Sequence, residues 1–206
     1  MTEHPVPVAI SSDHLAGATL YANRNDALDS WPRGAVIAEL GVGFGAYSQL
    51  IMDRTYPKLF DAYDLFNLHE KETLWGKPSS HFFKGMTQIE FYRERFKAHF
   101  DADRMRAFEG DSSGQLKRQP EHFYDVIYID GDHTLNGVKR DASVAISSIR
   151  PNGILVFNDY VYYDRTGRPY GVINVANDLC VNHGWKVKYI ALQPQMFCDI
   201  ALFKPN

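Results

Sequence analysis

The sequence has few cysteines, no long hydrophobic run and no surplus of basic residues. With only Cys180 and Cys198, a disulfide framework is excluded, and a reducing, cytoplasmic location is expected. No apolar run approaches the roughly 20 residues of a membrane-spanning helix, and the first residues lack the basic and apolar segments of a signal peptide. A net charge of −3 gives no general attraction to nucleic acid or anionic lipid, so we expect neither as a partner.

The length and composition are those of one globular domain. The chain has 206 residues, of which 45% are hydrophobic, enough to bury a core without crosslinks. We expect a single domain over residues 1–206. Residues 1–34 would form an N-terminal helical extension, with irregular chain up to residue 20, and residues 67–100 would form an insert on the substrate side.

Short apolar runs alternate with helical patterns along the chain. Buried strands are predicted at 35–40, 60–65, 105–109, 124–130 and 154–157. Helices are predicted at 21–30, 47–54, 86–100, 138–149 and 170–183. The final strands, 185–192 and 199–203, are joined by a short link that favours an antiparallel pair. This order predicts a Rossmann-like, doubly wound α/β fold with a seven-stranded sheet, mostly parallel with an antiparallel last strand.

A glycine-rich segment, Glu39-Leu-Gly-Val-Gly-Phe-Gly45, follows the first buried strand and opens a helix. Its glycines allow a tight turn and a close approach of a ligand to the backbone. Asp64 ends the next strand, where an acid accepts hydrogen bonds from ribose hydroxyls, with Asp61 as a nearby competitor. The pattern also satisfies the dinucleotide motif G-x-G-x-x-A. Adenosyl and nicotinamide cofactors both fit, and so does a tight turn without a ligand.

Polar side chains end two further strands. Asp130-Gly-Asp-His133 follows one strand, and Asn158-Asp159 follows the next. Since the carboxyl ends of such strands line one crevice, these side chains should lie close together. Converging carboxylates repel each other, and a hard cation such as Mg²⁺ would relieve this. Helix capping explains single residues here but not both groups. Gly110-Asp-Ser112 follows the 105–109 strand and fits either a common turn or a ligand contact.

Three segments carry a resemblance to a known family. Tyr-Ile-Asp-Gly-Asp-His, Gly-Val-Lys-Arg-Asp and Pro-Asn-Gly-Ile-Leu-Val-Phe-Asn-Asp-Tyr resemble class I S-adenosylmethionine-dependent methyltransferases of the macrocin-type O-methyltransferase family. The strand-end pattern is also similar to that of catechol O-methyltransferase. The resemblance extends over about residues 35–204. It implies a cofactor site formed by Glu39, Gly41, Gly43, Gly45, Tyr47, Ser48, Asp64, Asp111, Ser112 and Asp130.

The same resemblance implies a catalytic apparatus. Asp130, Asn158 and Asp159 would bind Mg²⁺, with Asn158 replacing an aspartate that is usual in the family. Asp132 matches the family's general base, and His133 is a rival because its ordinary pKa lies near ~6.5. The implied reaction is a metal-assisted methyl transfer to a hydroxyl group of a small molecule, such as a sugar, a phenol or a natural product.

Two segments are candidates for binding the acceptor. They are residues 67–85, with Trp75, His81, Phe82 and Phe83, and residues 161–168, with Tyr162, Tyr163, Arg165 and Arg168. These aromatic residues fit stacking on a substrate ring and packing at loops or in a homo-oligomer equally well.

Two other functions compete with methyl transfer. A nicotinamide-dependent oxidoreductase explains the glycines and Asp64 but not the strand-end groups. A non-catalytic adenosyl-binding protein has no use for clustered acids.

Overall fold

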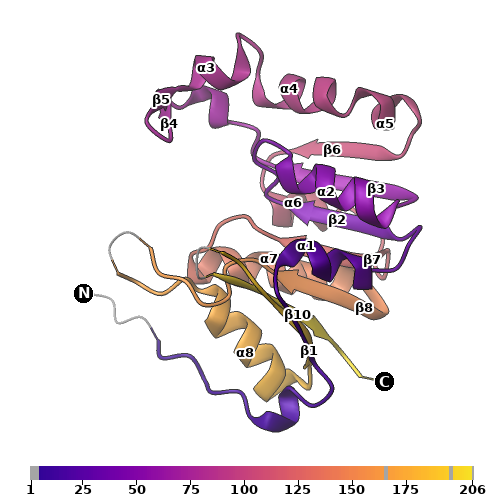
Figure 1. Cartoon of the computed structure of the whole chain (residues 1–206), viewed down its shortest axis with the longest axis vertical. Coiled ribbons are helices and arrows are strands. Elements are labelled where there is room, and N and C mark those ends of the chain that lie inside the picture. The colour runs from indigo at the N-terminus through magenta and orange to yellow at the C-terminus, as the bar shows by residue number, and fades with distance from the viewer. Residues whose placement is uncertain (1–4, 165–166, 195–196, 206) are drawn as a thin grey trace.

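The computed structural model describes residues 5–164, 167–194 and 197–205. The helices and strands of this part (Figure 1) are β1 (Thr19–Tyr21), α1 (Arg24–Ala27), β2 (Val36–Leu40), α2 (Ala46–Thr55), β3 (Leu59–Asp64), β4 (Thr73–Leu74), β5 (Lys77–Pro78), α3 (Ser79–Phe83), α4 (Gln88–Arg95), α5 (Lys97–Asp101), β6 (Met105–Glu109), α6 (Ser112–Leu116), β7 (Tyr124–Ile129), α7 (Leu135–Ser148), β8 (Ile149–Phe157), α8 (Val172–His183), β9 (Lys186–Leu192) and β10 (Cys198–Phe203).

The main sheet has the strand order β1-β9-β10-β8-β7-β2-β3-β6. Strands β8, β7, β2, β3 and β6 are parallel to one another, whereas β10 is antiparallel to both of its neighbours. The predicted doubly wound sheet with an antiparallel last strand is confirmed. Its described part has eight strands rather than seven, because β1 pairs with β9. This pairing covers backbone groups that would otherwise form an exposed sheet edge.

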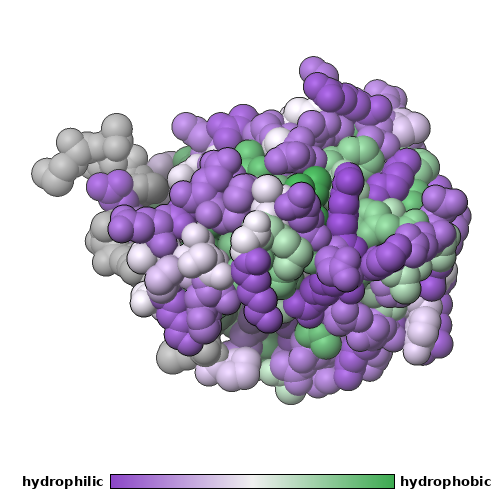
Figure 2. All heavy atoms as spheres, turned by 90° about the horizontal axis from the view of Figure 1, so that it is seen from above, coloured by the Kyte–Doolittle hydropathy of each residue, from purple (hydrophilic) through white to green (hydrophobic). Residues whose placement is uncertain are grey.

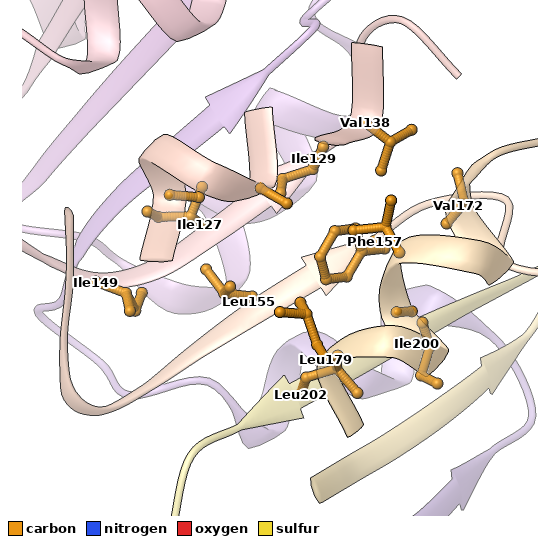
Figure 3. Packing of buried hydrophobic residues seen from close by; sticks show 14 of the residues in the cluster. Ile127, Ile129, Val138, Ile149, Leu155, Phe157, Val172, Leu179, Ile200 and Leu202 are labelled. Atoms are coloured by element: carbon orange, nitrogen blue, oxygen red, sulfur yellow. The ribbon is translucent and has the colours of Figure 1, made fainter. Parts of the chain in front are cut away.

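Helices cover both faces of the sheet. On one face, α6, α7 and α8 pack against strands β7, β8 and β10, as Figure 3 shows for Val138, Phe157 and Leu179. On the other face, α1, α2 and α4 enclose a second core that includes Trp31, Ile51 and Tyr92. Strands covered on both faces are mostly apolar, apart from single buried acids such as Glu39 and Asp61, and this makes them recognisable in the sequence.

Several predicted boundaries differ from the structure. The helix expected at 86–100 is two helices, because the backbone leaves the helical region at Phe96, which ends α4 and starts α5. Helix α7 ends at Ser148, and Ile149 already belongs to β8, which bulges before pairing again at Ile154. The N-terminal extension contains β1 as well as the short α1, so it is only partly helical.

The face in Figure 2 is mostly hydrophilic, with hydrophobic residues in small patches. Within the described ranges, no helix is both long and apolar enough to cross a membrane.

Asp61 is a structural residue in the buried middle of β3. Its side chain is fully buried, and both of its oxygens accept hydrogen bonds from Arg106, at 2.7 and 2.6 Å. The hydroxyl of Tyr124 donates a further bond to it at 2.5 Å. This placement removes Asp61 as a competitor of Asp64 for a ribose.

Replacing Asp61 with alanine is therefore expected to lower stability. The Asp61→Ala change leaves Tyr124 and the partly exposed Arg106 without their acceptor, which costs about 3 kcal/mol, at the low end for a broken buried pair. The melting temperature should fall by roughly 6–12 °C for a chain of this size. Asp53→Ala, on the exposed side of α2, is the matched control and should leave it nearly unchanged. Equal melting temperatures for both variants would contradict this assignment.

Candidate functional site

The hydrogen-bond ladder of the sheet continues past the strand ends. These bonds are Gly41 N to Tyr63 O (2.7 Å), Asp130 N to Leu40 O (2.8 Å), Asn158 N to Ile129 O (3.0 Å) and Gly110 N to Asp64 O (2.9 Å). The residues that follow β2, β3, β6, β7 and β8 therefore stay in register at one edge. The two strand-end groups predicted from the sequence are brought together there.

The three glycines of the loop after β2 have different tasks. A Cβ on Gly41 would lie 2.1 Å from the carbonyl oxygen of Asp130, so no larger residue fits there. A Cβ on Gly45 would lie 2.6 Å from the ring of Phe96, which makes Gly45 a packing position for α4. At Gly43, with φ +53°, no atom lies within 4 Å of such a Cβ. Gly43 is thus the glycine whose missing side chain leaves the cavity open.

A cavity of about 630 Å³ opens over this loop, within the range typical of small-molecule sites. Its lining includes most of the predicted cofactor residues, namely Glu39, Gly41, Gly43, Tyr47, Asp64, Asp111, Ser112 and Asp130. Gly45 and Ser48 do not line it. Ser48 instead supports the lining, because its hydroxyl donates to Glu39 at 2.5 Å.

Glu39 is a buried carboxylate on the cavity wall. Burial raises its pKa to about 8, although the hydrogen bond from Ser48 opposes this shift. Arg24, at the start of α1, lines the same cavity. Its guanidinium lies 4.3 Å from the centre of the Tyr47 ring and donates to the Tyr128 hydroxyl at 3.2 Å. The cavity therefore presents one acidic and one basic group near the glycine loop.

Asp64 holds the glycine loop in place. One of its carboxylate oxygens accepts from the backbone amides of Val42 (2.9 Å) and Gly43 (3.1 Å), and the other accepts from Phe66 N at 2.7 Å. The side-chain nitrogen of Gln88 adds a fourth and longer bond at 3.3 Å. Because a carboxylate has about four lone-pair sites, a ligand on the cavity wall would replace this weakest bond.

Asp111 and Ser112 begin α6 on the opposite side of the cavity. Asp111 caps that helix by accepting from Gly114 N at 2.8 Å, and the bonds from Ser113 and Gly114 lower its pKa. Ser112 donates to Asp141 of α7 at 2.7 Å. Asp141 is buried and also lines the cavity.

The strand-end group beside the cavity is linked by internal contacts. Asp130 Oδ1 accepts from the side-chain nitrogen of Asn158 at 2.7 Å and lies 3.4 Å from Nε2 of His133. Burial lowers the pKa of His133, but the nearby carboxylates of Asp130, Asp159 and Asp132 outweigh it, and the net shift is upward. Among the described residues, Nε2 of His133 is buried without a hydrogen-bond partner. A protonated His133 would thus relieve the carboxylate repulsion that we had assigned to a cation.

The arrangement does not support the expected magnesium site. The Asn158 amide turns its nitrogen toward Asp130, and a nitrogen that donates a hydrogen bond there offers no lone pair to a cation. Within residues 5–164, 167–194 and 197–205, no group of three or more His, Cys, Asp or Glu side chains is arranged to hold a metal ion.

The two candidate bases lie in different surroundings. Asp132 accepts from Thr134 N at 2.9 Å, pairs with Arg140 at 3.6 Å and lies against Gly137 of α7. The ring of His133 stacks on Tyr170 with a centroid distance of 4.6 Å and an interplanar angle of 6°. Asp132 is therefore occupied at the start of α7, whereas His133 lies between acids beside an aromatic surface.

The aromatic residues of the insert mostly pack on the glycine loop. Phe44 lies 5.2–5.3 Å, between ring centres, from Trp75, Phe82 and Phe83. Trp75 remains 72% exposed and lines the cavity. In the second candidate segment, Tyr162 contacts Tyr170 and Phe197, while Arg165 lies outside the described residues.

The fold and this cavity define a class of nucleotide-cofactor-binding α/β proteins, and the comparisons with known proteins identify the family. Residues 27–160 match the methyltransferase-domain family, so the chain belongs to it, as a class I S-adenosylmethionine-dependent methyltransferase. No curated protein matches the chain.

Solved structures agree in fold. The chain is similar to an O-methyltransferase family protein from Burkholderia thailandensis (14% identity, TM-score 0.60, covering 89% of this chain and 55% of that one). It is also similar to a putative rRNA methylase from Clostridium thermocellum (10% identity, TM-score 0.62, covering 89% of this chain and 94% of that one). A third similar structure is a precorrin-6y C5,15-methyltransferase from Geobacter metallireducens (14% identity, TM-score 0.57, covering 88% of this chain and 86% of that one). The chain thus spans just over half the length of the Burkholderia protein.

Sequence reasoning missed Arg24, Asp141, Gln193 and Asp199. Burial raises the pKa of Asp199 to about 7, against the opposing charge of Arg24. An acid within the apolar strand Cys198–Phe203 was a visible signal for Asp199. Asp141 ends the segment Gly-Val-Lys-Arg-Asp that carries part of the resemblance. Arg24 and Gln193 carry no local signal, because tertiary packing alone places them.

Gly43→Ala is expected to weaken binding of S-adenosylhomocysteine at least about tenfold, because the added methyl group projects into the cavity. Gly17→Ala is the matched control, since Gly17 also has a positive φ and open space around a Cβ but does not line the cavity. Both variants should lose roughly 1–2 kcal/mol of stability to the left-handed backbone. Calorimetry showing equal affinity in the two variants would reject the role of Gly43.

Glu39→Gln should stabilise the free protein at alkaline pH. The pKa of Glu39 is raised from 4.5 to about 8, so its contribution to stability is present below about pH 4.5 and is lost as the pH rises through 8. Glutamine keeps the acceptor for Ser48 without the charge. At about pH 9 the melting temperature of the variant should exceed that of the wild type by several degrees.

The exposed Glu94→Gln change on α4 is the control and should show no such difference. A Glu39→Gln variant that melts below the wild type at alkaline pH would show that Glu39 is stably ionised in the free protein.

Proposed function

We propose that the protein transfers a methyl group from S-adenosylmethionine to a hydroxyl group of a small molecule, as the resemblance to macrocin-type O-methyltransferases implies. The observation that carries this proposal is the contact between His133 and Asp130 at the end of β7, in which Asp130, but not His133, lines the cavity. A hydroxyl group is a poor nucleophile until it loses its proton, and this pair provides a base where the cavity meets the strand-end group.

The cavity wall fits the amino-acid end of this cofactor. Glu39 would accept hydrogen bonds from an ammonium group, and Arg24 would bind a carboxylate. The side chains of Glu39 and Arg24 are at least half-buried and line the cavity. Ligand groups of opposite charge would offset the cost of burying them there. Asp64 would accept from ribose hydroxyls, and Gly43 leaves room for the ligand.

When bound, S-adenosylmethionine supplies an electrophilic methyl group, whose bond to sulfur breaks as its bond to the acceptor oxygen forms, releasing S-adenosylhomocysteine. His133, in its neutral form with the proton on Nε2, would accept the acceptor's proton at Nδ1. Asp130, 3.4 Å from Nε2 of His133, stabilises the resulting imidazolium ion.

The acceptor would bind on the aromatic side of His133. Tyr170 stacks on the histidine ring, and Tyr162 contacts both Tyr170 and Phe197. Such a surface favours a flat or cyclic acceptor, a phenol or a sugar ring. The proposed partner is thus a small molecule rather than nucleic acid. No step of this mechanism is assigned to a metal, because the Asn158 amide nitrogen faces Asp130.

A transfer assay tests the proposal. Formation of S-adenosylhomocysteine would be followed with sugar, catechol and macrolide acceptors. With an accepted substrate, His133→Ala should lower kcat about 100-fold or more while cofactor affinity changes little. Asp132→Asn should lower turnover less, because Asp132 is bound to the start of α7.

If Asp132→Asn lowered kcat more than His133→Ala did, Asp132 would be the base. Cofactor binding without transfer to any acceptor class would favour a non-catalytic adenosyl-binding protein.

A further inference from the structure

A chain of side-chain hydrogen bonds runs from the cofactor cavity to the strand-end group. Arg24 donates to the hydroxyl of Tyr128 at 3.2 Å, and Tyr128 donates to Asp199 Oδ2 at 3.1 Å. The other oxygen of Asp199 accepts from the side-chain nitrogen of Gln193 at 2.6 Å. Asp199 and Tyr128 are both buried, so water does not replace these partners.

Gln193 connects this chain to Asn158. The side-chain nitrogen of Gln193 also donates to Asn158 Oδ1, at 3.3 Å. The nitrogen of Asn158 then donates to Asp130 Oδ1 at 2.7 Å. Asn158 is buried, with 6% of its surface exposed.

The carboxylates at the two ends fix the direction of these bonds. Asp199 and Asp130 each need a donor, so the nitrogen of Gln193 faces Asp199 and the nitrogen of Asn158 faces Asp130. If Asn158 turned its oxygen toward Asp130, its nitrogen would face the nitrogen of Gln193. Gln193 could correct this only by turning its oxygen toward Asp199, which would leave Oδ1 of that buried carboxylate without its donor and keep only the bond from Tyr128 to Oδ2.

A magnesium ion bound by Asp130 and Asn158 needs oxygen atoms from both. We propose that Gln193 and Asp199 are positioning residues that hold the Asn158 amide nitrogen toward Asp130, so that this strand-end group works through hydrogen bonds and binds no divalent cation. The catalytic consequence of this arrangement rests on the proposed function. Its primary readout, metal binding, does not depend on methyl transfer.

The test titrates Mn²⁺ into the full chain at about pH 8, above the pKa of Asp199, and follows free Mn²⁺ by electron paramagnetic resonance. The wild type should show no saturable binding with Mn²⁺ in large excess. Asn158→Asp should gain saturable binding, because it places a second carboxylate opposite Asp130. Gln193→Ala should gain weaker binding, because Asn158 can then turn its oxygen toward Asp130.

Gln49→Ala is the matched control, since it removes a surface amide that bonds Asp53 on α2, and it should behave as the wild type does. A melting curve checks that each variant is folded, and Gln193→Ala decides the test if Asn158→Asp does not fold. Saturable Mn²⁺ binding by the wild type that Asp130→Asn abolishes would overturn the inference. Folded Gln193→Ala without any gain of binding would overturn the positioning role.

Methyl transfer by the wild type should be unchanged by EDTA. If no acceptor is methylated but the Mn²⁺ results are as expected, the proposed function fails and the inference about the site stands.

Discussion

The close approach of Gly41 to the backbone of Asp130 sets the geometry of the whole site. A Cβ at Gly41 would lie 2.1 Å from the Asp130 carbonyl oxygen, and Asp130 N bonds Leu40 O at 2.8 Å. The glycine loop after β2 is thereby held against the end of β7. Because Asp130 lines the cavity and contacts His133, the same contact places the cavity next to the base that we propose. Backbone packing, rather than flexible side chains, therefore determines the distance between the cavity and His133.

The second feature of the site is its buried charge. Glu39 and Asp199 carry pKa values raised by burial, to about 8 and about 7, and Arg24 is the cation whose charge opposes both shifts. Such charges lower the stability of the free protein and are retained where a ligand or a reaction uses them. Internal hydrogen bonds offset part of this cost in the free protein, and under the proposed function the charges of the cofactor would offset the rest. In the strand-end group, the amide nitrogen of Asn158 donates to Asp130, and protonation of His133, which the neighbouring acids favour, would offset their repulsion when no acceptor is being deprotonated.

The sequence predicted the parts of this structure that depend on local pattern. The apolar runs at 35–40, 60–65 and 124–130 are β2, β3 and β7, because strands buried on both faces have a continuous apolar signal. The edge strand β1 was missed, since three residues have no such signal and their pairing depends on β9, far along the chain. The same holds for Arg24 and Gln193, which only tertiary packing brings to the site. The acids at the strand ends are visible in the sequence. The orientation of the Asn158 amide is not, and a magnesium site would require the amide oxygen, not the nitrogen, to face Asp130.

Calorimetry on the full-length wild-type chain, titrated in parallel with S-adenosylhomocysteine and with NAD, tests the central claim most directly. The cavity formed by Glu39, Arg24, Gly43 and Asp64 should bind S-adenosylhomocysteine at one saturable site and should bind NAD much more weakly or not at all. Saturable binding of NAD with no heat from S-adenosylhomocysteine would contradict the assignment of this cavity to an adenosyl cofactor.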